Sequence, residues 1–484
     1  MKQIAKLVIM AGVLVLFGAH VGFAAYNHSG DTDSVNFRSA YPDKVGTKLD
    51  SCTLCHKGTK TMASCQWCHK TYGYDASGNI DDTLNLYGIA YRSAGRDQAA
   101  LVTIEADDSD VDGYSNKVEI AAIRYPGDPD DTPAKVPAAY RIYTRDQLDQ
   151  MPQHTQFLLM NVTKSSGGDS YVQYSGVVME ELLNRAGMLS SATDIIVYSP
   201  DGFYYSHPLL PPVSQDPLHL QYFVIGPYPK GTFYYSAEAD MSLTGYGWCD
   251  YSAPSCEGRI KSEDGVPIPD DLKMLLGIKR DGVYLTPGVL DSSNKLNGEG
   301  PFRVVPPQVI PGHPDQSSKS SHQDVIWPYN EYNDHNAGAS TRSTTIVKVD
   351  PLPPGTTDIN VLEAGWNYID DNKIVVYGAI DPVPTILEKL DELVSAIGEA
   401  GKGKFKNPSS QRVLIQKVEV VMKQVTNGAY SGTLEKLQND ILQKTDGCIV
   451  TGTIDKNDWV TDCDIQKQLY WAINEIVVLL NIIL

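Results

Sequence analysis

Two short motifs near the N-terminus combine cysteine and histidine at a spacing suited to haem attachment. They read Cys52-Thr-Leu-Cys55-His56 and Cys65-Gln-Trp-Cys68-His69. Two thiols at this spacing can form thioethers with the two vinyl groups of one haem, and the histidine that follows can ligate the iron. The sequence therefore predicts two covalent haem c groups, with His56 and His69 as the proximal ligands.

Two other arrangements could use the same cysteines. Two cysteine pairs can hold zinc, and exported cysteines can form disulfides. Neither arrangement needs a histidine directly after both pairs, so haem attachment is favoured. For the sixth position of the iron, the nearest candidates are His28, before the first motif, and Met62, between the two. Either could instead be an ordinary N-terminal or loop residue.

An acidic segment after these motifs follows the pattern of a twelve-residue calcium loop. Its expected ligands are, in order, Asp108, Asp110, Asp112, Tyr114, Asn116 and Glu119, with Gly113 at the sharp turn. Calcium takes six to eight oxygens, and these carboxylates, one backbone carbonyl and one amide (directly or through water) supply them. Apolar positions predict helices over 99–104 and 118–123. The alternative is an acidic loop exposed to solvent.

The first 25 residues have the pattern of a secretory signal peptide. A positively charged start leads into an apolar run over 7–17, and the segment closes on Ala24 and Ala25. The run is shorter than the roughly 20 residues that cross a bilayer, which favours a signal peptide over an uncleaved anchor. The pattern predicts export to the periplasm, the cell surface or the exterior, where disulfides can form.

The region 40–130 resembles small exported cytochromes of metal-reducing and sulfate-reducing bacteria. The matching residues are LDSCTLCHKG at 49–58 and LNLYGIAYRSAGRD at 84–97. In that family a haem motif is followed by an N-x-Y-G helix start and then an acidic calcium loop. The second motif of this chain is an insertion between those parts. The resemblance implies a small helical haem and calcium module.

The chain has 484 residues, enough for several domains, and a formal net charge of −19 from 59 acidic and 40 basic residues. Nucleic acids and anionic membranes bind through excess Lys and Arg, so neither is expected as the main partner. Outside the N-terminal segment, no run of about 20 apolar residues predicts a transmembrane span.

Short apolar and aromatic runs separated by turns predict mostly β structure over 138–380, with one amphipathic helix at 176–188. This part resembles the molybdopterin-binding domain of the sulfite oxidase fold, through residues 174–187, 192–203 and 297–307. Active members bind molybdenum through a cysteine, but only Ser and Thr are offered at 161–176. Hydroxyls replace a thiolate ligand poorly. Molybdopterin is therefore not expected, and the domain is expected to be a non-catalytic scaffold, binding or docking module.

The remaining cysteines form two local pairs, for which we expect disulfides. Cys249 and Cys256 enclose a polar loop, and Cys448 and Cys463 bracket a connection between C-terminal helices. Arg303, in the β-rich part, could mark an anion or cofactor pocket or could pair with a local acid.

The C-terminal part is expected to be a helical module. Ile386, Leu390, Leu393 and Ile397 recur on one face of a helix, and 473–484 is strongly apolar but too short to span a bilayer. The segment resembles small helical modules at the ends of exported bacterial surface proteins, through NPSSQRVLIQKV and LEKLQNDILQKTDGC.

The expected fold is thus multidomain α+β. Its parts are a signal peptide (1–25), a dihaem module (26–105), a calcium loop and linker (106–137), a sulfite-oxidase-like domain (138–380) and a helical bundle (381–484). The favoured function is electron transfer by an exported dihaem cytochrome, with a redox protein or an extracellular electron donor or acceptor as partner. The alternatives are a molybdopterin-dependent oxidoreductase that reduces its own haems, and a surface or matrix adhesion protein.

Overall fold

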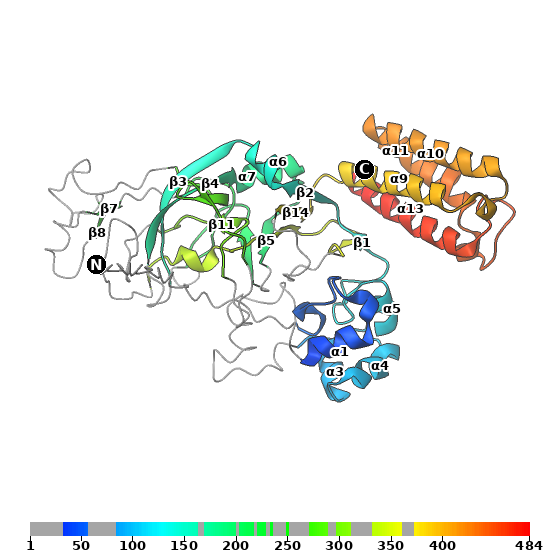
Figure 1. Cartoon of the computed structure of the whole chain (residues 1–484), viewed down its shortest axis with the longest axis horizontal. Helices are drawn as coiled ribbons and strands as arrows, with labels where there is room; N and C mark the ends of the chain where they lie inside the picture. The colour runs from blue at the N-terminus through cyan, green and yellow to red at the C-terminus, as the bar shows by residue number, and fades with distance from the viewer. Residues whose placement is uncertain are drawn as a thin grey trace, which may run out of the picture.

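The computed structural model describes residues 32–56, 84–162, 169–199, 203–216, 220–228, 233–235, 248–250, 271–288, 297–310, 332–360 and 372–484. A helical N-terminal module, a β-rich domain and a C-terminal helical bundle occupy different parts of the chain, in agreement with the α+β class (Figure 1). The predicted signal peptide and His28, Met62, Cys65, Cys68, His69 and Cys256 lie outside the described residues. The backbone of Cys249 lies in strand β8 (Trp248–Asp250), which pairs with β7 (Phe233–Tyr235).

The N-terminal module consists of short helices around a small core. They are α1 (Thr32–Ala40), α3 (Leu86–Ser93), α4 (Gln98–Thr103) and α5 (Asn116–Ala121), with the 3-10 turns η2 (Pro42–Lys44), η3 (Cys52–Leu54) and η6 (Ile104–Ala106). Buried side chains such as Phe37, Leu101 and Ile120 form the core. The helices α4 and α5 flank the acidic segment, as the apolar positions predicted, although α5 already ends at Ala121.

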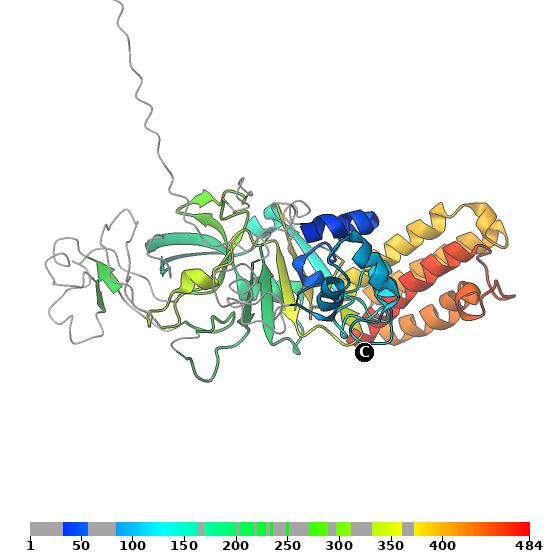
Figure 2. The ribbon, with the colours of Figure 1, turned by 90° about the horizontal axis from the view of Figure 1, so that it is seen from below.

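The β-rich domain contains two five-stranded sheets. Figure 2 shows this domain from below, with the helical bundle beyond one of its ends. One has the order β10-β9-β4-β3, with β11 also paired to β9; its strands are β3 (Gln153–Met160), β4 (Ser170–Val178), β9 (Leu275–Arg280), β10 (Val283–Tyr284) and β11 (Arg303–Val305). The other has the order β2-β14-β12-β5-β6; its strands are β2 (Tyr140–Thr144), β5 (Asp194–Tyr198), β6 (Tyr204–Pro208), β12 (Ile346–Asp350) and β14 (Lys373–Gly378). Within these sheets only the β12–β14 pair is parallel. Alternate apolar residues of the strands face a shared core.

The helix predicted over 176–188 begins later than the sequence suggested. Residues 176–178 continue β4, where Gly176, Val177 and Val178 pair with β9. The helix α7 (Met179–Ala186) follows and ends at Gly187, whose φ of +79° is the left-handed conformation that glycine adopts most easily. Pairing with a neighbouring strand therefore overrides the helical periodicity at its first three positions. A second short helix, α6 (Arg145–Asp149), follows β2.

The helical bundle contains three helices of 17, 19 and 21 residues, together with shorter helices and turns. Its elements are α9 (Val383–Glu399), α10 (Pro408–Thr426), α11 (Tyr430–Lys436), a π turn (Leu437–Ile441), a 3-10 turn (Leu442–Lys444), α12 (Gly447–Val450) and α13 (Cys463–Ile483). The predicted apolar face of α9 is buried throughout. The expected disulfide between Cys448 and Cys463 is present, with 5.5 Å between the Cα atoms. Among the described helices, none combines the length and apolarity needed to cross a bilayer.

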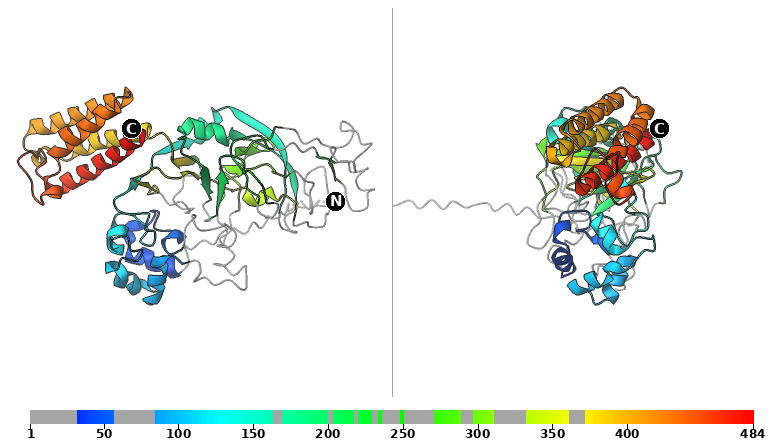
Figure 3. Two further views of the ribbon diagram at one scale, coloured as in Figure 1. Left: turned by 180° about the vertical axis from the view of Figure 1, so that it is seen from behind. Right: turned by 90° about the vertical axis from the view of Figure 1, so that its right-hand side faces the viewer.

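A small ribbon joins the three parts. Strand β1 (Val136–Pro137) pairs in parallel with β13 (Thr356–Thr357). Seen from behind, the N-terminal module and the helical bundle lie at the same end of the β-rich domain (Figure 3). A Cβ atom on Gly355, next to β13, would lie 3.1 Å from Val478 of α13, so the bundle packs directly against this ribbon.

Candidate functional site

The first cysteine-histidine motif begins with the turn η3, which opens at Cys52. The side chain of Leu54 is buried in the module core, and His56 is buried and pairs through its backbone with Leu84. Cys55 is partly exposed and forms no disulfide. Cys55 is thus the described thiol of this motif that a thioether bond would use. The second motif lies outside the described residues.

One asparagine holds the backbone of this motif. The Asn85 side-chain amide donates to the carbonyl oxygens of Thr53, Leu54 and His56, at 3.2, 3.0 and 3.3 Å. Its side-chain oxygen accepts from the N–H of Gly88 at 2.8 Å and so caps α3. We call these contacts the Asn85 clasp. The clasp ties the start of α3 to the Cys52–His56 motif.

The helix α3 lies directly on the motif because residue 88 is glycine. A Cβ atom at Gly88 would come within 2.1 Å of the Cys55 carbonyl oxygen, closer than any side chain can approach. The same carbonyl accepts the backbone N–H of Asn85 at 2.9 Å. Tyr87, between these two residues, is fully buried in the module core. Asn85, Tyr87 and Gly88 of the N-x-Y-G sequence thus all help to pack α3 against the Cys52–His56 motif.

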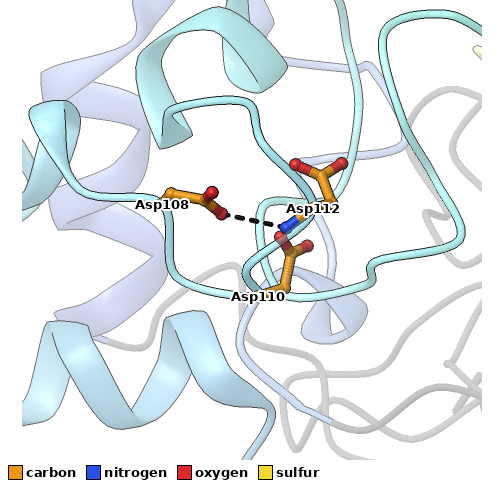
Figure 4. A group of neighbouring side chains, drawn as sticks. All are labelled: Asp108, Asp110 and Asp112. Carbon is orange, nitrogen blue, oxygen red and sulfur yellow. Dashed lines mark hydrogen bonds between the residues drawn. The ribbon is translucent and has the colours of Figure 1, made fainter.

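The acidic segment forms a loop that carries Asp108, Asp110 and Asp112 (Figure 4). Carboxylate oxygens of Asp108, Asp110 and Asp112 all lie within 4.8 Å of one another. The Asp108 carboxylate accepts the backbone N–H groups of Val111, Asp112 and Gly113 at 2.8, 3.2 and 2.9 Å. Gly113 has a φ of +100°, which glycine adopts without strain. The chain therefore folds back around the three carboxylates.

Tyr114 and Asn116 close the loop. The backbone N–H of Tyr114 donates to Asp112 at 2.8 Å. Asn116 is fully buried; its side-chain oxygen accepts from the Ser109 N–H at 3.2 Å, and its amide donates to the Ile104 carbonyl at 2.7 Å. Asn116 therefore ties the loop to the end of the preceding helix, in addition to the ligand role that the sequence suggests.

Buried carboxylates without hydrogen-bond donors distinguish this loop from an ordinary acidic turn. Glu119 is 0% and Asp110 6% exposed. Within the described part of the chain, neither oxygen of either carboxylate, nor Oδ2 of Asp112, has a hydrogen-bond partner. Burial, together with the charges of Asp110 and Asp112, raises the pKa of Glu119 to about 9. Burial and the charge of Asp112 raise the pKa of Asp110 to about 6. Ionising a buried carboxylate that has no partner costs several kcal/mol, and a divalent cation would offset that cost.

A second acidic group, which the sequence did not single out, lacks this property. Asp446, Asp455 and Asp458 also have oxygens within 4.8 Å of one another. The buried carboxylate of Asp458, however, accepts the backbone N–H groups of Gly447 and Asp455, at 3.3 and 2.7 Å. Its charge is therefore already stabilised by the local chain.

Arg303 of the β-rich domain pairs with a local acid. Its guanidinium lies 3.0 Å from Glu299 and donates to Tyr174 and Ser340 at 2.9 and 2.8 Å. Burial would raise the pKa of Glu299, but the charges of Arg303 and Arg280 lower it to about 2. Apart from the local acid expected beside Arg303, the members of this network come from three strands and two loops, which short-range sequence patterns do not bring together.

The described residues do not include His28, Met62, Cys65, Cys68 and His69, so their roles in haem binding stay a prediction. The expected Cys249–Cys256 disulfide likewise involves a residue outside them. Comparison with protein-family models, with curated proteins and with solved structures found no match for this chain. The functional interpretation therefore depends on the chain's own residues and geometry.

Proposed function

We propose that this protein is an exported c-type cytochrome that transfers electrons through covalently bound haem. The observation that supports this most directly is the Asn85 clasp. Three carbonyl groups of the Cys52–His56 stretch are held by one side chain, and α3 is seated on Cys55 through Gly88. Such a fixed backbone suits a segment that must present two thiols and an iron ligand to one planar group. When bound, haem would supply the one-electron chemistry.

The same proposal assigns calcium to the loop 108–119. Its supporting observation is the pair of buried carboxylates, Glu119 and Asp110, that lack donors. Oxygen-only ligands favour a hard cation, and the loop length matches calcium. A single site of this kind serves a structural role: it would fix α5 and the connection to the β-rich domain.

The β-rich domain is assigned a binding or docking role without catalytic molybdenum. Within the stretch 161–176, the hydroxyl of Ser175 bonds to that of Thr155 on the neighbouring strand β3, at 2.8 Å. An oxidoreductase with its own molybdenum centre is the second candidate, favoured only by the pairing of haem motifs with this domain.

A haem measurement on the purified protein tests the proposal. The pyridine haemochrome spectrum should give two haems per chain. Cys55→Ser and Cys65→Ser should each lower the ratio to about one, and each serves as the control for the other. Stoichiometric zinc with no haem would refute the cytochrome proposal, and stoichiometric molybdenum would refute the assignment of the β-rich domain.

A further inference from the structure

Asp131 links the N-terminal module to the β-rich domain, although no motif marks it. It is 3% exposed and lies between the loop 108–119 and strand β1. Its Oδ2 accepts from the Lys48 ammonium at 2.7 Å and from the backbone N–H of Tyr125 at 2.9 Å. Its Oδ1 accepts from the hydroxyl of Thr357, on β13. One carboxylate thus joins three chain segments.

The first of these segments leads to the haem motif. Lys48 is fully buried and precedes Cys52 by four residues. Its ammonium lies 4.8 Å from the centre of the Tyr125 ring, and its carbonyl accepts the Tyr125 hydroxyl at 3.0 Å. The Lys48 ammonium is out of contact with water, so burying its charge is costly. Asp131 offsets that cost as the counter-ion.

The second segment follows the calcium loop. Arg124 and Tyr125 follow the end of α5 by three and four residues. This helix bears Glu119, whose carbonyl accepts the Arg124 N–H at 2.8 Å. The Arg124 guanidinium lies 3.7 Å from Asp131 and donates to Asn360 at 3.4 Å.

We propose that Asp131 couples calcium binding by the loop 108–119 to docking of the N-terminal module on β13. This proposal rests on the calcium site proposed above. A cation bound to Glu119 would fix α5 and thereby the Tyr125 N–H and the Arg124 guanidinium that meet Asp131. The Thr357 hydroxyl, from the other domain, would in turn hold Asp131 and the loop in the binding conformation. Such coupling is reciprocal, so weakening the joint must weaken calcium binding.

A matched pair of threonines on β13 tests the coupling without changing any charge. Thr357 donates to Asp131, whereas the neighbouring Thr356 donates to the Pro353 carbonyl within the β-rich domain, and both are 4% exposed. In calcium titrations of the full chain, Thr357→Val should weaken binding about 3- to 10-fold. Thr356→Val should leave it within about twofold. Thr357→Ser, which keeps the hydroxyl, should restore wild-type affinity.

Small-angle scattering of the wild type gives a second measurement that needs no variant. Removal of calcium by a chelator should increase the largest dimension of the particle, because the module undocks, and added calcium should reverse the change. Unchanged calcium affinity in Thr357→Val, or equal losses in both valine variants, would overturn the coupling alone. An absence of calcium binding in the wild type would overturn the calcium site and the coupling together.

Discussion

Calcium binding to the loop 108–119 should release about one proton at pH 7. In the ion-free loop Glu119 has a pKa of about 9 and Asp110 of about 6. At pH 7 Glu119 is then roughly 99% and Asp110 roughly 10% protonated, whereas a bound divalent cation requires both to be ionised. The two fractions add up to about one proton per ion.

The number of protons should change with pH in a defined direction. At pH 5.5 most of Asp110 is also protonated, and the release should approach about two protons. At pH 9 Glu119 is half ionised, and the release should fall to about half a proton. Because protons compete with calcium, the apparent affinity should fall about tenfold as the pH drops from 8 to 7. Glu119 has a raised folded-state pKa, so its ionisation destabilises the ion-free module as pH rises from about 4.5 towards 9. Calcium should therefore stabilise more at pH 8 than at pH 5.5.

Isothermal titration calorimetry in buffers of different ionisation enthalpy measures this release directly. Glu119→Gln should weaken calcium binding and abolish most of the proton release at pH 7. Asp107→Asn is the matched control, since this exposed acid precedes the loop and is outside its expected ligands. A binding heat that is independent of the buffer at pH 7 would refute the reasoning, because it would show that Glu119 is already ionised before the cation binds.

Three further outcomes follow from the packing. Gly88→Ala should destabilise the N-terminal module by about 1–3 kcal/mol and lower the haem-to-protein ratio, because the Cβ would clash with the Cys55 carbonyl. Gly398→Ala, in α9 with open space around it, should leave the stability of that module and the haem ratio unchanged. Equal effects of the two variants would contradict the role given to Gly88. Asn85→Ala should cost about 2–4 kcal/mol in chemical unfolding, because the helix cap and three further hydrogen bonds are lost. Replacing Cys448 and Cys463 together by alanine should lower the stability of the bundle by about 3 kcal/mol, as expected for a separation of 15 residues, and a thermal transition unchanged by reductant would contradict this.

Local patterns in the sequence predicted much of the secondary structure. The apolar face of α9, the helices on either side of the acidic loop and the Cys448–Cys463 pair all depend on residues close together in the chain, so their spacing alone indicates them. The start of α7 was wrong by three residues. Helical periodicity there competes with pairing to β9, almost 100 residues further along the chain, and short-range patterns contain no information about that partner.

By itself, the sequence determined which residues we propose for haem and calcium, because both chemistries require fixed residue types at short spacings. Only the tertiary structure decided that Asn85 holds the carbonyls of a motif about 30 residues earlier, that Glu119 is buried without a donor, and that Asp131 joins Lys48 to Thr357. The physical reason is the same in each case. Burial and long-range hydrogen bonds depend on which distant segments pack together, and this packing sets the electrostatic cost that a bound cation or a paired charge must offset.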